Sequence, residues 1–128
     1  MTVYVDDVRH PFGNMVMCHL WADTVEELLD FVDRIGVQRK WIQGHPELSF
    51  GKHRNASWVH FDIALSKKRK ALELGAVLTD KYGPSEHVAR LDLKSEDPGR
   101  RDRGEKMIQR IAQIRAERGP VAGQDRLL

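Results

Sequence analysis

The sequence predicts a small single α/β domain, with a mixed or mainly parallel sheet, helices packed on it and an appended C-terminal helix. Segments with alternating apolar residues are followed by segments with helical spacing, and the two kinds take turns along the chain. A length of 128 residues, 41% of them hydrophobic, is enough for one core without disulfides or a structural metal. We expect the α/β domain over residues 1–93, and a linker, an amphipathic helix and a disordered tail over residues 94–128.

Composition excludes several classes of protein. The formal net charge of +2 permits binding to nucleic acid without requiring it. The single cysteine, Cys18, cannot form a disulfide within the chain, and we expect it to be a small buried apolar side chain. The apolar runs are too short to cross a membrane, and the N-terminus reads as a strand rather than a signal peptide. These features predict a reduced, cytoplasmic protein with no membrane association.

The first predicted strand, residues 2–5, ends in Asp6 and Asp7. Carboxylates at a strand end handle metals or phosphates in many α/β enzymes, although a buried strand also often ends where the chain returns to solvent. The turn-rich residues 9–14 follow, and we expect them to lie over the end of this strand. That arrangement brings Arg9 and His10 close to any site built there, unless they belong to a plain surface turn.

The second predicted strand, residues 15–21, has one apolar face that includes Cys18 and one mixed face that includes His19. Neighbouring strand residues point to opposite faces, so Cys18 and His19 are not expected to form a nucleophile and base pair. His19 is either an acid–base or ligand residue or a hydrogen-bonded structural histidine.

The first helix should begin at Thr24, which has capping-box spacing with Glu27, and should end before Gly36. We expect it to serve packing alone. A helical turn over residues 37–42 carries Trp41, which either stacks a nucleic-acid base or closes the edge of the core. Residues 43–57 form a long loop in which His45 and His53 have no zinc-ligand spacing, which excludes a closed structural zinc site.

The segment over residues 58–70 is the strongest candidate for chemistry. A strand to about Ile63 places His60 and Asp62 on one face, where they can act as general base and orienting carboxylate, or as metal ligands, or as a structural polar pair. A helix from near Ser66 follows, with Ser66 as its N-cap. Its N-terminus and Lys67 favour phosphate binding, whereas the basic run to Lys70 also fits a solvated helix face.

The remaining chain is predicted to hold a short strand at residues 76–79, a turn at 82–85, a strand at 87–93 and a linker at 95–103. Asp102 and Glu105 have N-cap-to-N3 spacing for a last helix that ends before Gly119 and Pro120. An isolated helix of this length is marginal in water, so residues 102–118 should dock on the domain or form a homo-oligomer.

Several ordered blocks resemble one family. They are residues 3–7, 17–19, 22–24, 34–37, 60–63, 66–67 and 75–76. Together they are similar to the bacterial and phage family known as domain of unknown function 4031, over about residues 1–79. The resemblance implies kinship and no established reaction. Its blocks include most of the candidate site residues selected above.

The preferred functional hypothesis is a metal-assisted hydrolase or transferase acting on a phosphate-containing substrate, either a nucleotide or a nucleic acid. The alternative is a non-catalytic module that binds nucleic acid or an acidic partner, with a homo-oligomeric accessory protein compatible with either. The predicted catalytic residues are His60, Asp62, His19 and Asp7. The predicted phosphate ligands are Ser66, Lys67 and Arg9. The predicted ligands of a divalent metal ion are Asp6, Asp7 and Asp62.

Overall fold

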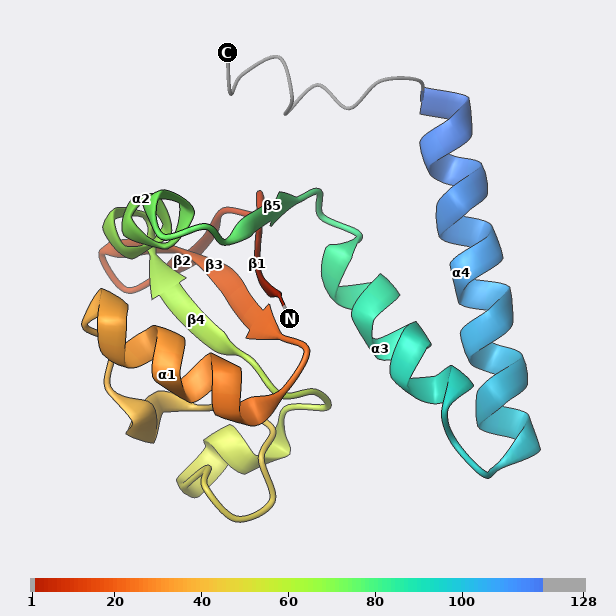
Figure 1. The fold of residues 1–128 in the computed structure, drawn as a ribbon, viewed down its shortest axis with the longest axis horizontal. Helices are drawn as coiled ribbons and strands as arrows, with labels where there is room; N and C mark the ends of the chain where they lie inside the picture. Colours follow the sequence, from red (N-terminus) through yellow and green to blue (C-terminus); the bar gives the residue numbers. More distant parts are fainter. Residues whose placement is uncertain (1, 119–128) are drawn as a thin grey trace. The chain divides into compact units, whose positions relative to one another are not determined.

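The computed structural model describes residues 2–118, and the chain forms two compact units, Met1–Thr79 and Asp80–Leu128. The first unit holds a five-stranded sheet and two α-helices, and the second holds two α-helices (Figure 1). Three strand pairs are antiparallel, and only β1 and β5 are parallel, so the sheet is mixed rather than mainly parallel. The strands are β1 (Val3–Asp6), β2 (His10–Phe12), β3 (Met15–Ala22), β4 (Phe61–Ala64) and β5 (Val77–Thr79).

Strand β3 lies at the centre of the sheet and pairs along both of its edges. Leu20 pairs with both Val5 of β1 and Phe61 of β4. One residue cannot pair with two strands on the same edge, so β1 and β4 flank β3 on opposite sides. Met17 likewise pairs with both β2 and β4, which puts β2 on the same edge as β1. Residues 7–9, which connect β1 to β2, do not pair with β3.

The two faces of the sheet differ sharply in chemistry, because alternate strand residues point to opposite sides. Helices α1 (Val25–Ile35) and α2 (Leu65–Glu73) pack on the face that carries Val5, Leu20 and Phe61. As predicted, the N–H of Glu27 donates to the Thr24 hydroxyl at the start of α1, and Gly36 ends the helix with a φ of 78°. The opposite face carries the candidate site.

Three local predictions in the first unit are wrong. Residues 9–14 were expected to be a loop, but β2 and β3 form a hairpin through them; Pro11 is tolerated because β2 is a short strand at the rim of the sheet. The strand predicted from Trp58 begins only at Phe61, with His60 in an isolated bridge to Gln43. Helix α2 begins at Leu65 with Ala64 as its N-cap, so Ser66 lies inside the first turn and does not cap the helix.

The long connection between α1 and β4 is ordered by two short 3-10 helices, η1 (Arg39–Trp41), as predicted, and η2 (Gly51–Asn55). It folds back on the chain at Gly44, where φ is 78° and a Cβ would overlap the carbonyl group of Trp58. Only glycine permits this approach. Gly44 therefore fixes the path of the backbone that leads into the candidate site.

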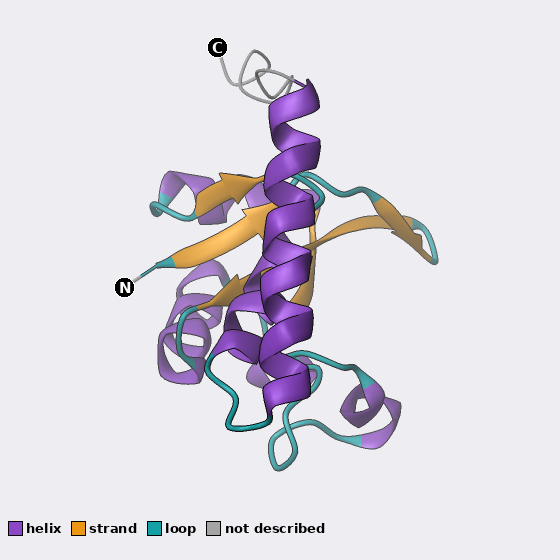
Figure 2. Cartoon of the chain, turned by 90° about the vertical axis from the view of Figure 1, so that its right-hand side faces the viewer, coloured by secondary structure: helices purple, strands orange, loops and turns teal. Residues whose placement is uncertain are grey.

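The second unit is a pair of helices, α3 (Gly83–Leu93) and α4 (Pro98–Arg118), and α4 runs without interruption (Figure 2). They approach closely at Gly104, where a Cβ would lie 2.6 Å from the carbonyl oxygen of Ala89. The predicted strand at residues 87–93, turn at 82–85 and linker to residue 103 are wrong. Pro84 and Pro98 stand in first helical turns, where proline is favoured, and Asp97 rather than Asp102 caps α4 by accepting from the N–H of Gly99.

Between residues 2 and 118, no helix combines the length and the apolar character that crossing a membrane requires. The tail expected at residues 123–128 and the predicted helix end at Gly119 lie outside the described residues.

Replacing Gly44 with alanine should lower the free energy of unfolding by roughly 2–4 kcal/mol, because the new Cβ meets a positive φ and the carbonyl of Trp58 at once. Gly51→Ala is the matched control, since Gly51 has a φ of 58° in the same loop and open space around it. Urea denaturation of both variants measures the difference. Equal losses of stability in the two variants would contradict the proposed role of the close approach.

Protonation of the Asp80 carboxylate should destabilise the second unit in acid. Burial acts to raise the pKa of Asp80, but hydrogen bonds from Arg115 and from the N–H of Tyr82 outweigh it and hold the pKa below its usual value. A lowered pKa stabilises the fold above the unfolded-state value of about 3.9, and this contribution is lost as pH falls below about 4. Thermal unfolding should show Asp80→Asn less stable by about 1–2 kcal/mol near neutrality and equal to wild type near pH 2, unlike an exposed control, Glu105→Gln.

Candidate metal centre

The candidate site lies on the sheet face opposite α1 and α2, and His19 stands at its centre. Strand register places His19 directly across from Asp62 of β4. On its other edge, β3 pairs with β1 just before Asp6 and with β2 at His10. Because residues 7–9 leave the ladder, both Asp6 and His10 approach His19 from this edge. Sheet pairing alone thus gathers one histidine from each of two strands between two aspartates.

Asp6 holds His19 in place. Its carboxylate is completely buried and lies 2.6 Å from His19 Nδ1, and it also accepts the backbone N–H groups of His19 and Val8. A carboxylate can only accept, so Nδ1 carries a proton and the lone pair of neutral His19 sits on Nε2. Carboxylate–histidine pairs of this kind orient the imidazoles of many metal sites.

Three imidazole nitrogens surround one oxygen of Asp62. The Nε2 atom of His60 lies 3.4 Å from Asp62 Oδ1, and the Nε2 atoms of His10 and His19 each lie 3.8 Å from it. Within residues 2–118, His10 Nε2 and Asp62 Oδ1 are buried atoms without a hydrogen-bond partner. Donor atoms of His10, His19 and Asp62 all lie within 4.8 Å of one another. This set is called the His10–His19–Asp62 group below.

His60 is positioned by its own backbone surroundings. Its Nδ1 lies 3.0 Å from the carbonyl oxygen of Trp58, which can only accept, so Nδ1–H donates and the lone pair of the neutral ring is on Nε2. The Trp58 ring stacks on the imidazole with centroids 4.1 Å apart. Nε2 therefore presents a lone pair to the carboxylate of Asp62. A proton or a cation between the two atoms removes the resulting repulsion.

The other oxygen of Asp62 is satisfied within the protein. Asp62 Oδ2 accepts a hydrogen bond of 2.9 Å from Gln43 Nε2, and the backbone of Gln43 pairs with that of His60 in an antiparallel bridge. Gln43 thus fixes the rotamer of Asp62 and leaves Oδ1 directed at the three histidines. Sequence reasoning gave no role to Gln43, because nothing in the chain's periodicity links residue 43 to residue 62.

Local charges shift two of these groups. Burial acts to lower the pKa of His19, but its hydrogen bond to Asp6 and the charges of Asp6 and Asp62 raise it above the usual value. Burial acts to raise the pKa of Asp62, but the protonated form of His60, the hydrogen bond from Gln43 and the charge of His19 hold it below its usual value. Asp62 is therefore a carboxylate at neutral pH, ready to accept a cation.

Cys18 has no place in this chemistry. It lies on the opposite face of β3 from His19 and is completely buried, as expected. Burial, with the charge of Asp6 adding to it, raises the pKa of the thiol to about 12. A thiol with this pKa is not a nucleophile near neutrality.

Four other predicted site residues are not among the donors of the His10–His19–Asp62 group. Asp7 pairs with Lys68 at 3.1 Å, and Arg9 is exposed in the same three-residue excursion. Ser66 is exposed on α2, and the ammonium of Lys67 lies beside Gly36 at the end of α1, where the helix dipole favours a cation. His10 was expected near the site but was given no role. The Gly13-Asn14 pair between two strand-like runs is the hairpin signal that predicts its position.

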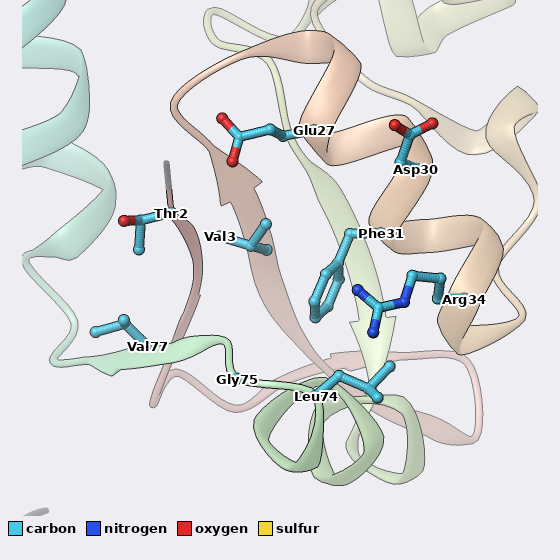
Figure 3. Close-up of a pocket in the computed structure, with 9 residues that line it drawn as sticks. All are labelled: Thr2, Val3, Glu27, Asp30, Phe31, Arg34, Leu74, Gly75 and Val77. Carbon is cyan, nitrogen blue, oxygen red and sulfur yellow. The ribbon is translucent and has the colours of Figure 1, made fainter.

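A separate cavity of about 450 Å³ lies beside α1 (Figure 3). Its walls include Glu27 and Asp30 of α1, and the guanidinium of Arg34 lies 5.9 Å from the centre of the Phe31 ring. No residue of the His10–His19–Asp62 group lines it. The cavity and the histidine-rich face are therefore distinct features of the first unit.

Replacing Asp6 with asparagine should lower the pKa of His19, because Asp6 contributes more than Asp62 to raising it. Because the pKa of His19 is raised in the folded protein, the Asp6–His19 pair stabilises the fold fully below the unfolded-state histidine pKa of about 6.5. This stabilisation is lost as pH rises through the higher folded value. NMR titration of the His19 ring protons in metal-free protein measures the shift. An unchanged His19 titration in Asp6→Asn would contradict this account.

No curated protein and no solved structure matches the chain. A family model described as a protein of unknown function, DUF4031, matches residues 3–92. The match covers more than half of the chain and extends beyond the blocks at residues 1–79 that carry the resemblance. It includes every strand, both helices of the first unit and nearly all of α3. The chain therefore belongs to the DUF4031 family.

Proposed function

We propose that the protein binds one divalent metal ion at the His10–His19–Asp62 group and uses it for hydrolysis or transfer at a phosphate-containing substrate. The observation that carries this proposal is the set of three Nε2 atoms around Asp62 Oδ1, where two buried polar atoms have no hydrogen-bond partner in the described chain. Leaving such atoms unpaired costs about 1–3 kcal/mol each, and a cation coordinated by both offsets that cost.

The donor set fits a borderline transition metal. Two imidazole nitrogens and one carboxylate oxygen are a ligand set used by catalytic zinc sites and by iron(II) sites, both of which leave positions open. The proposal therefore replaces the all-aspartate set predicted from sequence. Asp62 remains a ligand, Asp6 becomes the partner that orients His19, and Asp7 is engaged by Lys68.

The surrounding residues suit acid–base chemistry. A zinc ion held by these residues would lower the pKa of a bound water to about 7, and would polarise a phosphoryl oxygen. His60 carries its lone pair on Nε2, beside the proposed ligands, so it can accept a proton from the attacking group and return it to the leaving group. Trp58 stacks on His60 and keeps its ring in this orientation.

Phosphate as the reacting group is supported by nearby cations. Lys68 contacts Asp7, and Arg9 is exposed, both at the excursion that leads directly to His10. We assign the phosphate-binding role to the exposed Arg9, because Lys67 is engaged at the end of α1, Lys68 pairs with Asp7 and Ser66 does not cap α2. The substrate is then a phosphate ester, a nucleotide or a nucleic acid.

A second candidate is a non-catalytic module that binds nucleic acid or an acidic partner. The observation that favours it is the exposure of several cations outside the metal centre, including Arg69 and Lys70 on α2 and Arg103 and Arg110 on α4. The exposed Met107 of α4 is compatible with a homo-oligomer through residues 102–118. Steeply salt-dependent retention on heparin without any response to metals would favour this candidate.

Divalent metal should raise the melting temperature of the wild-type protein. At a free ion concentration 100-fold above the dissociation constant, binding adds about 2.7 kcal/mol, a shift of roughly 10 °C for a domain of this size. Zinc, manganese, cobalt and magnesium should be compared by thermal shift. Asp62→Asn and His10→Gln should abolish the response, and Asp6→Asn should weaken the affinity about 10- to 100-fold, since it removes the partner that orients His19.

His87→Gln is the matched control, because it removes a histidine of the second unit and should leave the metal response intact. Wild-type protein that shows no shift with any of these ions, or an Asp62→Asn variant that keeps the full shift, would refute the metal centre.

A further inference from the structure

The loop between α1 and β4 is held in one conformation by its own hydrogen bonds. The buried Ser49 hydroxyl donates to the carbonyl oxygen of Ile42 at 2.7 Å and accepts the N–H of His45 at 3.0 Å. His45 Nδ1 accepts two further N–H groups of the loop, and Arg54 Nε donates to the Ser49 carbonyl oxygen. These bonds satisfy the loop internally, so it holds its shape without a partner.

This loop exposes a group of rings that a folded chain ordinarily buries. The aromatic patch, defined as Trp41, Phe50 and His53, includes two large apolar residues that are 43% and 45% exposed. Within it, the Trp41 ring lies 5.8 Å from Phe50 and 5.9 Å from His53. Holding rings together in water brings little benefit to folding, so the patch is suited to contact with another molecule.

The charge around the aromatic patch indicates what kind of molecule that is. Lys40 lies 4.9 Å from the Trp41 ring centre, and Lys52 and Arg54 are exposed on η2. Between residues 39 and 58, Glu47 is the single acidic residue. Aromatic rings surrounded by cations complement a polyanion that carries flat apolar groups. Unpaired nucleobases on a phosphate backbone have this chemistry, whereas the bases of a duplex are already stacked.

The aromatic patch is joined to the metal centre by a two-residue connection. Trp41 ends η1, and the buried Ile42 follows with φ and ψ of −57° and 137°. The next residue, Gln43, hydrogen-bonds Asp62 Oδ2 and pairs with the backbone of His60. Trp41 thus lies two residues along the chain from the residue that positions Asp62, so a strand stacked on Trp41 and Phe50 can continue toward the proposed site of reaction.

We infer that the phosphate-containing substrate is single-stranded nucleic acid, bound by base stacking on Trp41 and Phe50 and by the cations Lys40, Lys52 and Arg54. This inference rests on the proposed function for its chemistry but not for its binding surface. The metal centre then acts on a phosphodiester or terminal phosphate of the bound strand.

The test is fluorescence anisotropy of full-length protein with a labelled mixed-sequence 10-mer, as DNA and as RNA, in the presence of EDTA. Trp41→Ala should weaken binding about 5- to 150-fold, while Trp41→Phe should retain most of it, because either ring can stack a base. A Lys40/Lys52 to Gln variant, which keeps the Arg54 bond that holds the loop, should make binding less dependent on salt, with a logarithmic slope smaller by about 0.7 for each phosphate that the protein no longer neutralises.

Leu91→Ala is the control, since Leu91 is 46% exposed on α3 and lies outside the aromatic patch. Equal affinity for a duplex of the same sequence, or unchanged binding by Trp41→Ala, would overturn the inference. So would a dimer that Trp41→Ala dissociates, because the patch would then be an interface between copies of the chain.

Different results would refute the metal centre and the nucleic-acid inference. His10→Gln should lose the thermal response to metal and keep binding the 10-mer in EDTA. A metal response without nucleic-acid binding overturns the substrate inference alone. Trp41-dependent binding without any metal response refutes the metal chemistry and leaves the second candidate, a nucleic-acid-binding module.

Discussion

The buried carboxylate of Asp6 is the constraint on which the rest of the first unit depends. It has no access to solvent and accepts hydrogen bonds from the ring and backbone of His19 and from the backbone of Val8. An ionised carboxylate in such a position is stable only when it is fully hydrogen-bonded. The same bonds tie β1 to β3, direct the chain out of the ladder at residue 7 and fix the orientation of His19. The Asp6 carboxylate therefore both stabilises the fold and orients a residue of the candidate site.

The two faces of the sheet have different roles, and Asp6 and His19 lie on the polar one. One face is wholly apolar and packs under α1 and α2, which provides stability. The other face concentrates histidine, tryptophan and aspartate where strand pairing holds them at fixed separations. A rigid scaffold beneath polar groups is what a metal centre needs, because ligand positions must be kept within a few tenths of an ångström.

The loop between α1 and β4 connects this face with the aromatic patch. Gly44 lets the loop approach Trp58 closely, and Gln43 couples the loop to Asp62. A change in the loop therefore acts on the position of Asp62 and His60 as well as on the patch. This coupling gives a physical reason for a long, internally hydrogen-bonded connection in a domain of this size.

Much of the first unit can be read from the sequence because local rules decide it. The capping box at Thr24, the C-terminal Gly36 and the period-2 alternation of residues 15–21 each specify an element without reference to distant residues, and all three are confirmed. Alternation also placed His60 with Asp62 on one face and separated Cys18 from His19. Local pattern failed for residues 83–93, where the helix is stabilised by close packing of Ala89 against Gly104 of α4 rather than by its own periodicity.

The donor set of the candidate site was decided by tertiary structure alone. The sequence by itself determined the family, the α/β class and the candidate residues His19, His60 and Asp62, since these lie in regular segments with a readable face. It could not assign His10 to the group, Asp6 to the support of His19 or Asp7 to Lys68, because each depends on which strands flank β3 and where the chain leaves the ladder. Strand order and register are set by long-range pairing, and that information is not present in any local stretch of sequence.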